Sequence, residues 1–147
     1  MSDRPLARVA GRGAATYLGP LPSWGQSLAA RLAREGFLDS EPDLLAVEEY
    51  LPGQGERHLD RTLSAATACS ISLGSACLMD FAKRASDRTT SLLLERGSLL
   101  VLRDEARYEW KHSIARRSTD TVNGNTLRRK RRVSLTFQAS SLGPGSA

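Results

Sequence analysis

Short apolar runs that alternate with polar residues recur through most of this chain, and they limit the folds available to it. In residues 69–73, two serines alternate with Cys69, Ile71 and Leu73, which is the two-residue period of a strand with one buried face. Turn residues separate such runs about every ten residues. The expected strands are 44–50, 69–73, 77–82, 91–94, 98–103, 107–112 and 133–137. Many short strands with frequent turns predict a mainly β fold, either a β-sandwich or a jelly roll.

One segment has a different period. Between residues 23 and 35, Trp24, Leu28 and Leu32 recur at four-residue spacing, and Gly36 follows. This pattern predicts an amphipathic helix that ends near a glycine, packed outside the strands. Residues 1–20 mix Arg, Gly and Ala without a period, so we expect a loose N-terminal segment there. Residues 21–138 then form one domain, and the Ser/Gly/Pro-rich residues 139–147 form a disordered tail.

Composition and charge exclude several classes of protein. The 147 residues suit a single domain, and 40% apolar with 25% charged residues is close to the globular average. The net charge of +5 is compatible with an anionic partner and equally with simple solubility. No apolar run approaches the roughly 18 residues of a membrane span, and the N-terminus lacks the apolar core of a secretory signal. We therefore expect a protein without membrane association, cytoplasmic or, in a eukaryote, nuclear.

The two cysteines lie in apolar, strand-like segments. Cys69 and Cys77 do not suggest a disulfide framework, and they are expected to be small buried hydrophobic residues rather than soft metal ligands. This use of cysteine fits a reducing compartment.

The chain contains only two histidines. His58 and Asp60 are two residues apart, so on a strand they would project from the same face. His112 follows on a later strand. Two imidazoles and one carboxylate can occupy one face of an octahedral iron(II) and leave three positions open. Taken alone, the triplet also fits ordinary surface or hydrogen-bonded histidines.

Seven sequence blocks extend this observation over about three quarters of the chain. They include the turn Pro52-Gly53-Gln54-Gly55, and they span residues 47–55, 58–60, 70–75, 79–81, 96–102, 106–114 and 132–137. In this order the blocks resemble the AlkB-like family of iron(II)- and 2-oxoglutarate-dependent dioxygenases. The resemblance implies a double-stranded β-helix, or jelly roll, with iron(II) as cofactor and 2-oxoglutarate and dioxygen as cosubstrates.

The resemblance also implies roles for individual residues. His58, Asp60 and His112 match the iron ligands. Arg132 matches the arginine that pairs with the distal carboxylate of 2-oxoglutarate, because a guanidinium binds a carboxylate through two charge-assisted hydrogen bonds. Tyr50 matches the tyrosine whose hydroxyl bonds the same carboxylate, and Ser134 matches a small polar contact to the cosubstrate.

Three features depart from the family pattern. Glu48 stands where the family usually has asparagine, and an inward carboxylate would repel 2-oxoglutarate. Gln138 stands where a second arginine is common. Counting by twos from Arg132 places Gln138 on the same strand face, so we expect it to contact the cosubstrate without supplying a charge. The gap from Gly55 to His58 is one residue shorter than usual.

The function implied by the resemblance is oxidative dealkylation of N-alkylated DNA or RNA bases. We expect the protein to be a monomer. The basic run Arg128, Arg129, Lys130 and Arg131 then either contacts the nucleic-acid backbone or forms a solvated loop. Glu48, Gln138 and the short N-terminal segment leave two alternatives open. One is a degenerate, non-catalytic jelly-roll module that binds nucleic acid or protein. The other is a truncated dioxygenase that acts on a protein substrate.

Overall fold

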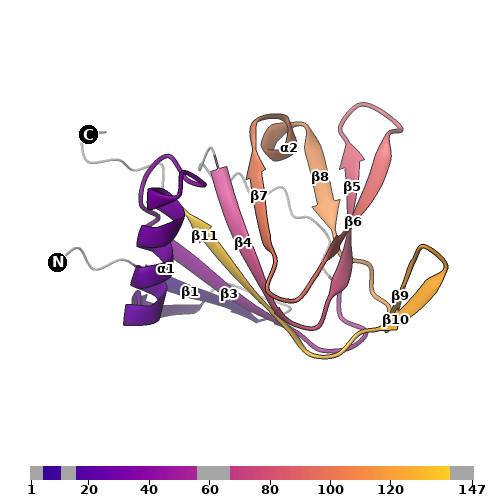
Figure 1. Ribbon diagram of the computed structural model, residues 1–147, viewed down its shortest axis with the longest axis horizontal. Helices are drawn as coiled ribbons and strands as arrows, with labels where there is room; N and C mark the ends of the chain where they lie inside the picture. The colour runs from indigo at the N-terminus through magenta and orange to yellow at the C-terminus, as the bar shows by residue number, and fades with distance from the viewer. Residues whose placement is uncertain (1–4, 11–15, 56–66, 140–147) are drawn as a thin grey trace.

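Two β-sheets form the two layers of the fold. The computed structural model describes residues 5–10, 16–55 and 67–139, and Figure 1 shows the layers with a helix outside one of them and a hairpin at one end. The elements are, in chain order, β1 (Pro5–Ala10), β2 (Thr16–Pro20), α1 (Ser23–Arg34), β3 (Leu44–Tyr50), β4 (Thr67–Gly74), β5 (Cys77–Lys83), β6 (Thr89–Leu94), β7 (Leu99–Arg103), α2 (Asp104–Tyr108), β8 (Trp110–Ser113), β9 (Thr119–Val122), β10 (Asn125–Arg128) and β11 (Arg132–Gln138).

The larger sheet has the strand order β2-β1-β3-β11-β4-β7, and the smaller has the order β6-β5-β8. The last strand, β11, pairs antiparallel with both β3 and β4, so residues distant in sequence meet at the centre of the larger sheet. Strands β9 and β10 form a separate hairpin. Two packed, mainly antiparallel sheets confirm the predicted mainly β, jelly-roll class.

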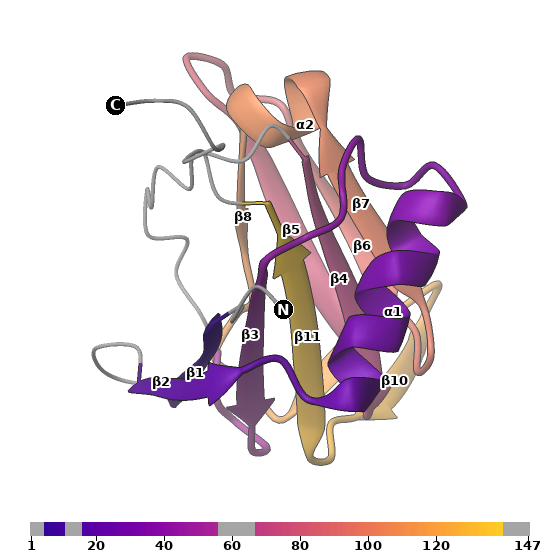
Figure 2. The same ribbon diagram turned by 90° about the vertical axis from the view of Figure 1, so that its left-hand side faces the viewer.

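The helix α1 covers the outer face of the larger sheet, as Figure 2 shows. Ala29 and Leu32 of the helix join Leu45, Leu135 and Phe137 of the sheet in one apolar cluster. The helix bounds agree with the predicted 23–35. Burying this apolar stripe against the sheet stabilises a helix that would be marginal alone at twelve residues.

A second apolar cluster lies between the two sheets. Its buried members are Cys77, Met79, Phe81, Leu94 and Ile114, and partly buried side chains from β3, β7 and β8 pack against them. This inner layer is the space that the site residues of β11 face. Among the described residues, no helix is long and apolar enough to cross a membrane.

The predicted strand at 107–112 is wrong in its first half. Residues 104–108 form the short helix α2, and β8 begins only at Trp110. Asp104 and Glu105 lie in the first turn of α2, where carboxylates favour the positive end of the helix dipole. Lys83 of β5 then holds Glu105 through a 2.7 Å ion pair. A five-residue helix is too short to show a periodic pattern in the sequence.

Two further segments differ from expectation. Residues 5–10 and 16–20, expected to be loose, are the strands β1 and β2 at the edge of the larger sheet. Strand β1 pairs parallel with β3 through backbone groups, which requires no apolar period. The hairpin β9–β10 was not predicted either, although its turn Asn123-Gly124 has positive φ at both residues. Asn-Gly is a strong signal for a two-residue hairpin turn.

Candidate cosubstrate and metal site

The inward face of β11 carries most of the predicted cosubstrate residues. Arg132 lies opposite Tyr50 of β3, and Ser134 lies opposite Glu48 of β3. Because residues two apart on a strand share a face, Gln138 follows on the same side. Arg132, Ser134 and Gln138 are all buried, at 3–5% exposure. The predicted facing of this strand is therefore confirmed, and the interior between the sheets contains a polar strip.

Arg132 is the most unusual member of this strip. Its Nη2 donates a 2.9 Å hydrogen bond to Ser72 Oγ, but its buried Nε and Nη1 have no hydrogen-bond partner in the part of the chain that the structure describes. Burying such donors unpaired costs about 1–3 kcal/mol each. The guanidinium carbon lies 5.2 Å from the centre of the Tyr50 ring. A carboxylate bound at this guanidinium would accept a hydrogen bond from one of the two unpaired donors and would offset the buried charge.

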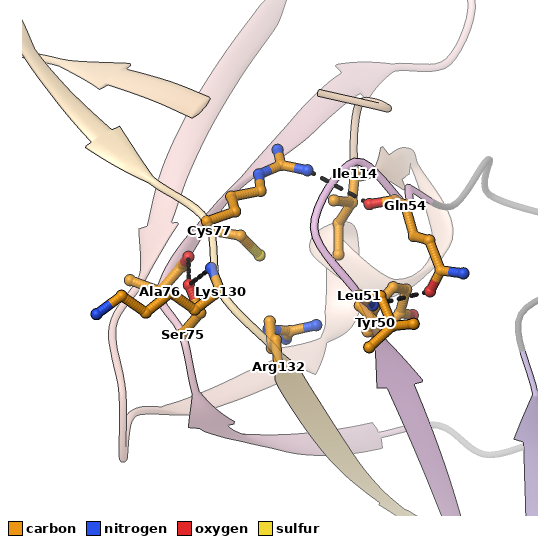
Figure 3. Close-up of a pocket in the computed structure, with 10 residues that line it drawn as sticks. Tyr50, Leu51, Gln54, Ser75, Ala76, Cys77, Ile114, Lys130 and Arg132 are labelled. Carbon is orange, nitrogen blue, oxygen red and sulfur yellow. Dashed lines mark hydrogen bonds between the residues drawn. The ribbon is translucent and has the colours of Figure 1, made fainter. Parts of the chain in front are cut away.

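The Arg132 side chain lines a narrow pocket together with Tyr50, Gln54, Cys77 and Ile114. Figure 3 shows Arg132 pointing toward Tyr50, as expected for a pair that shares one ligand. The pocket therefore lies between the end of β3, the start of β11 and the chain just after β8.

Glu48 faces the same interior and is already engaged. The hydroxyl of Tyr50 donates a 2.6 Å hydrogen bond to Glu48 Oε2. Ser134 Oγ lies 2.9 Å from Ser70 Oγ of the neighbouring strand. Glu48 therefore points inward, the orientation in which its charge would repel 2-oxoglutarate. Its carboxylate also accepts the hydrogen bond of the Tyr50 hydroxyl, which was expected to bind the cosubstrate.

Among the three predicted metal ligands, the structure describes only His112. It lies opposite Phe81 in the pairing of β8 with β5, and the two ring centres are 6.2 Å apart. Its neighbours two residues away, Trp110 and Ile114, both pack in the inner cluster, so His112 faces the same layer. His58 and Asp60 lie outside the described residues. Within the described ranges, no group of three or more His, Cys, Asp and Glu side chains could hold a metal.

The turn that precedes His58 in sequence lies against the chain that follows His112. A Cβ atom on Gly55 would collide with the carbonyl oxygen of Ile114 and with the backbone of Ala115. Only glycine permits so close an approach of two backbones. The described part of the turn therefore ends beside the strand that carries His112.

The basic run does not behave as one surface. Arg129 is buried, so the expectation that it faces solvent or nucleic acid is wrong. Its Nε and Nη2 donate hydrogen bonds of 2.7 and 2.8 Å to the two oxygens of Asp120. Arg128, Lys130 and Arg131 are exposed, and Arg131 pairs with Glu49 at 3.1 Å.

Asp120 is a buried residue that the sequence reasoning missed. It is 1% exposed, and it also accepts hydrogen bonds from Arg117 Nε at 2.9 Å and from the backbone N–H of Leu78 at 3.2 Å. Burial alone would raise the pKa of Asp120, but the hydrogen bonds from Arg129, Arg117 and Leu78 outweigh it and hold the pKa below its usual value. The Asn123-Gly124 turn was the available signal, because it predicts the hairpin that carries Asp120.

The cysteines are buried and unpaired with each other, as expected. Burial raises the pKa of Cys69 to about 11, and it raises the pKa of Cys77 as well. Neither thiol is therefore a ready nucleophile at neutral pH.

Comparison with known proteins agrees with this architecture. The family model described as the 2OG-Fe(II) oxygenase superfamily matches residues 9–138. The Mus musculus tRNA (carboxymethyluridine(34)-5-O)-methyltransferase ALKBH8 is 42% identical over 110 residues, which are 73% of this chain and 16% of that protein. An Arabidopsis thaliana protein named Alkylated DNA repair protein ALKBH8 homolog is 33% identical over 147 residues, covering 82% of this chain and 42% of that protein.

This chain therefore spans less than half the length of either of these two relatives. The solved structure of OsALKBH1 matches with a TM-score of 0.50 and 20% identity, covering 78% of this chain and 59% of that one, and it supports the fold. The family match and the two relatives together show that the chain belongs to the 2OG-Fe(II) oxygenase superfamily and is AlkB-like.

Proposed function

We propose that this chain is an iron(II)- and 2-oxoglutarate-dependent dioxygenase in which Arg132 anchors the cosubstrate. The observation that supports this most directly is the pair of buried donors on Arg132 that lack a partner among the described residues. A carboxylate bound there would accept a hydrogen bond from at least one of these donors and neutralise the buried charge. Family membership implies both 2-oxoglutarate and iron(II).

His58, Asp60 and His112 are the proposed iron ligands. Two imidazoles and one carboxylate are a donor set suited to iron(II) with open coordination positions. His58 is the third residue after Gly55, a span of at most about 11 Å of chain, and Gly55 lies against Ile114, two residues after His112. His58 can therefore lie near His112 with only a short span of chain after the contact between Gly55 and Ile114.

The bound iron and 2-oxoglutarate would supply the oxidising chemistry, in which dioxygen converts 2-oxoglutarate to succinate and carbon dioxide and a C–H bond of the substrate is hydroxylated. The chain's own contribution is orientation and exclusion of water. Arg132 and Ser134 hold one side of the cosubstrate, and Gln138 supplies a neutral hydrogen-bonding group further along β11. Phe81, Trp110 and the rest of the inner apolar cluster keep the layer dry.

We propose N-alkylated bases of RNA or DNA as the substrate class, because hydroxylation of an N-alkyl carbon lets it leave as an aldehyde. The names of the two relatives refer to tRNA and to alkylated DNA, respectively. The net charge of +5 and the exposed Arg128, Lys130 and Arg131 suit a phosphate backbone.

An anaerobic titration tests the enzyme proposal directly. Iron(II) and 2-oxoglutarate should together give the weak visible charge-transfer band of the chelate, and His112→Ala should abolish it. With oxygen, methylated RNA and DNA oligonucleotides should then lose methyl groups by mass spectrometry and release formaldehyde. An unaltered band in His112→Ala would refute the ligand assignment, and a band without demethylation of either oligonucleotide would refute the substrate class.

One observation favours a second candidate, a non-catalytic jelly-roll module. The Tyr50 hydroxyl is bonded to Glu48, so a chain carboxylate competes for a group that the cosubstrate needs. This candidate predicts iron(II) binding without the charge-transfer band and without succinate formation.

A further inference from the structure

We infer that Asp120 and Arg129 form a positioning pair that holds together the two chain segments carrying the proposed iron ligands. The inference rests on the proposed function, because it takes His58 and His112 as ligands. Arg129 also lines the pocket that contains Arg132, but its guanidinium is already bonded to Asp120, and neither residue belongs to the ligand set or to the predicted cosubstrate contacts. We infer their role from the chain segments to which they are hydrogen-bonded.

The pair is buried and geometrically complete. Arg129 is 6% exposed and Asp120 is 1% exposed. The guanidinium meets the carboxylate in a two-pronged contact, with N–O distances of 2.7 and 2.8 Å. A buried ion pair of this kind is held in one orientation, because any rotation would leave charged groups unpaired away from water.

The remaining nitrogen of Arg129 reaches both ligand-bearing segments. Nη1 donates to the carbonyl oxygen of Ala115 at 2.7 Å and lies 3.5 Å from the carbonyl oxygen of Gln54. Ala115 is three residues after His112, and Gln54 is four residues before His58. One guanidinium therefore bridges the chain that leaves one proposed ligand and the chain that leads to the other two.

Asp120 connects this bridge to the smaller sheet. Its Oδ2 accepts a hydrogen bond from the backbone N–H of Leu78 in β5, and β5 is the strand that pairs with β8 and His112. The glycine at position 55 allows the two bridged backbones to touch. The ion pair thus joins β5, the chain after β8 and the turn before His58 at one point.

A metal site assembled from distant segments binds more tightly when those segments are held in place before the metal arrives. Removing groups that orient metal ligands typically lowers metal affinity about 10- to 100-fold. A merely stabilising ion pair would change the melting temperature and leave the metal affinity of the folded protein unchanged. Metal affinity and stability therefore separate the two roles.

The test uses the full chain, with Co²⁺ as a spectroscopic probe of the iron site. Arg129→Lys keeps the charge beside Asp120 but has no planar fork to bridge two carbonyls, and Arg129→Met removes the charge as well. Arg31→Met is the control for the loss of an arginine charge, since Arg31 forms a single, exposed 2.8 Å pair with Glu35 at the end of α1. Co²⁺ affinity is measured from the ligand-field absorption, and the folded fraction is measured by circular dichroism.

Both Arg129 variants should bind Co²⁺ about 10- to 100-fold more weakly than the wild type, and Arg31→Met should bind it equally well. Wild-type affinity in folded Arg129→Lys and Arg129→Met would overturn the inference. Should both single variants fail to fold, the pair Asp120→Asn with Arg129→Gln replaces the ions by neutral hydrogen-bonding groups and is judged by the same criterion. A wild type that binds no Co²⁺, or a His112→Ala variant that binds it normally, would instead refute the proposed metal site, and the inference with it.

Discussion

The hydroxyl of Tyr50 donates a 2.6 Å hydrogen bond to Glu48 Oε2 on the same strand, two residues away. Both side chains face the layer between the sheets, and Arg132 lies opposite Tyr50. The group proposed to bind the cosubstrate carboxylate is therefore bonded to a carboxylate of the protein. This contact sets the first prediction.

Glu48→Gln should strengthen 2-oxoglutarate binding roughly tenfold, which corresponds to about 1.4 kcal/mol. The substitution keeps the side-chain length, removes a negative charge from the pocket and weakens the hold on the Tyr50 hydroxyl. Binding is measured by isothermal titration with Mn²⁺ in place of iron. Glu49→Gln is the matched control, because Glu49 is the next carboxylate along β3 and pairs with Arg131. Equal gains in both variants would show a general charge effect.

Arg132→Met should weaken 2-oxoglutarate binding by about 2–5 kcal/mol while sparing metal binding. Without cosubstrate, the variant should melt at the wild-type temperature or above, because it removes two buried donors that lack partners among the described residues. The measurement is the rise in melting temperature on adding 2-oxoglutarate, which should vanish in this variant. Arg103→Met, at an exposed arginine of β7, should keep the rise. If Arg132→Met kept the rise in melting temperature, the carboxylate of 2-oxoglutarate would bind elsewhere.

Gln138→Arg should lower the apparent Michaelis constant for 2-oxoglutarate and raise the rate of succinate formation. Gln138 is buried at the inward face of β11, so an arginine there would add a positive charge beside the anionic cosubstrate. Uncoupled succinate production is measured under saturating iron(II) and oxygen. Ala139→Arg, one residue on, is the control for added charge alone. An unchanged rate in Gln138→Arg would mean that position 138 does not reach the pocket.

Asp120→Asn should destabilise the protein by about 3–5 kcal/mol at neutral pH, because it leaves the buried Arg129 charge uncompensated. The difference in unfolding free energy between the two proteins should become smaller as the pH falls. The folded-state pKa of Asp120 lies below its usual value, so its stabilisation is complete above about pH 4, the unfolded value. It is lost as pH falls through the folded-state pKa. Urea denaturation at several pH values should show the two proteins converging at low pH, and a constant gap would contradict the assignment.

Local pattern alone determined the parts of this fold that follow a strict period. The alternation of Val133, Leu135 and Phe137 placed Arg132 and Gln138 on the opposite face, and the structure has them there. The four-residue spacing in α1 gave its bounds and its outward position against the sheet. Such predictions succeed because side-chain direction in a strand or helix depends on position counted along the chain itself.

The edges of the fold could not be predicted in this way. Strand β1 pairs with β3 and strand β2 pairs with β1 through backbone groups, and the sequence of residues 1–20 shows no apolar period that would reveal them. The helix α2 is joined to β5 by a contact between Glu105 and Lys83, which are 22 residues apart. In both cases the stabilising partner lies elsewhere in the sequence.

The sequence predicted least well which charged side chains are buried. Within the run from 128 to 131, only the tertiary structure distinguishes Arg129, buried against Asp120, from its three exposed neighbours. The same holds for Glu48. The sequence indicated that its charge could repel 2-oxoglutarate, and only the structure shows that its carboxylate accepts a hydrogen bond from the Tyr50 hydroxyl. The sequence determined which face each strand residue presents, because that is a local geometric property. The folded chain alone decided which charges are buried and paired, because an ion pair depends on the three-dimensional meeting of two groups and on the water excluded around them.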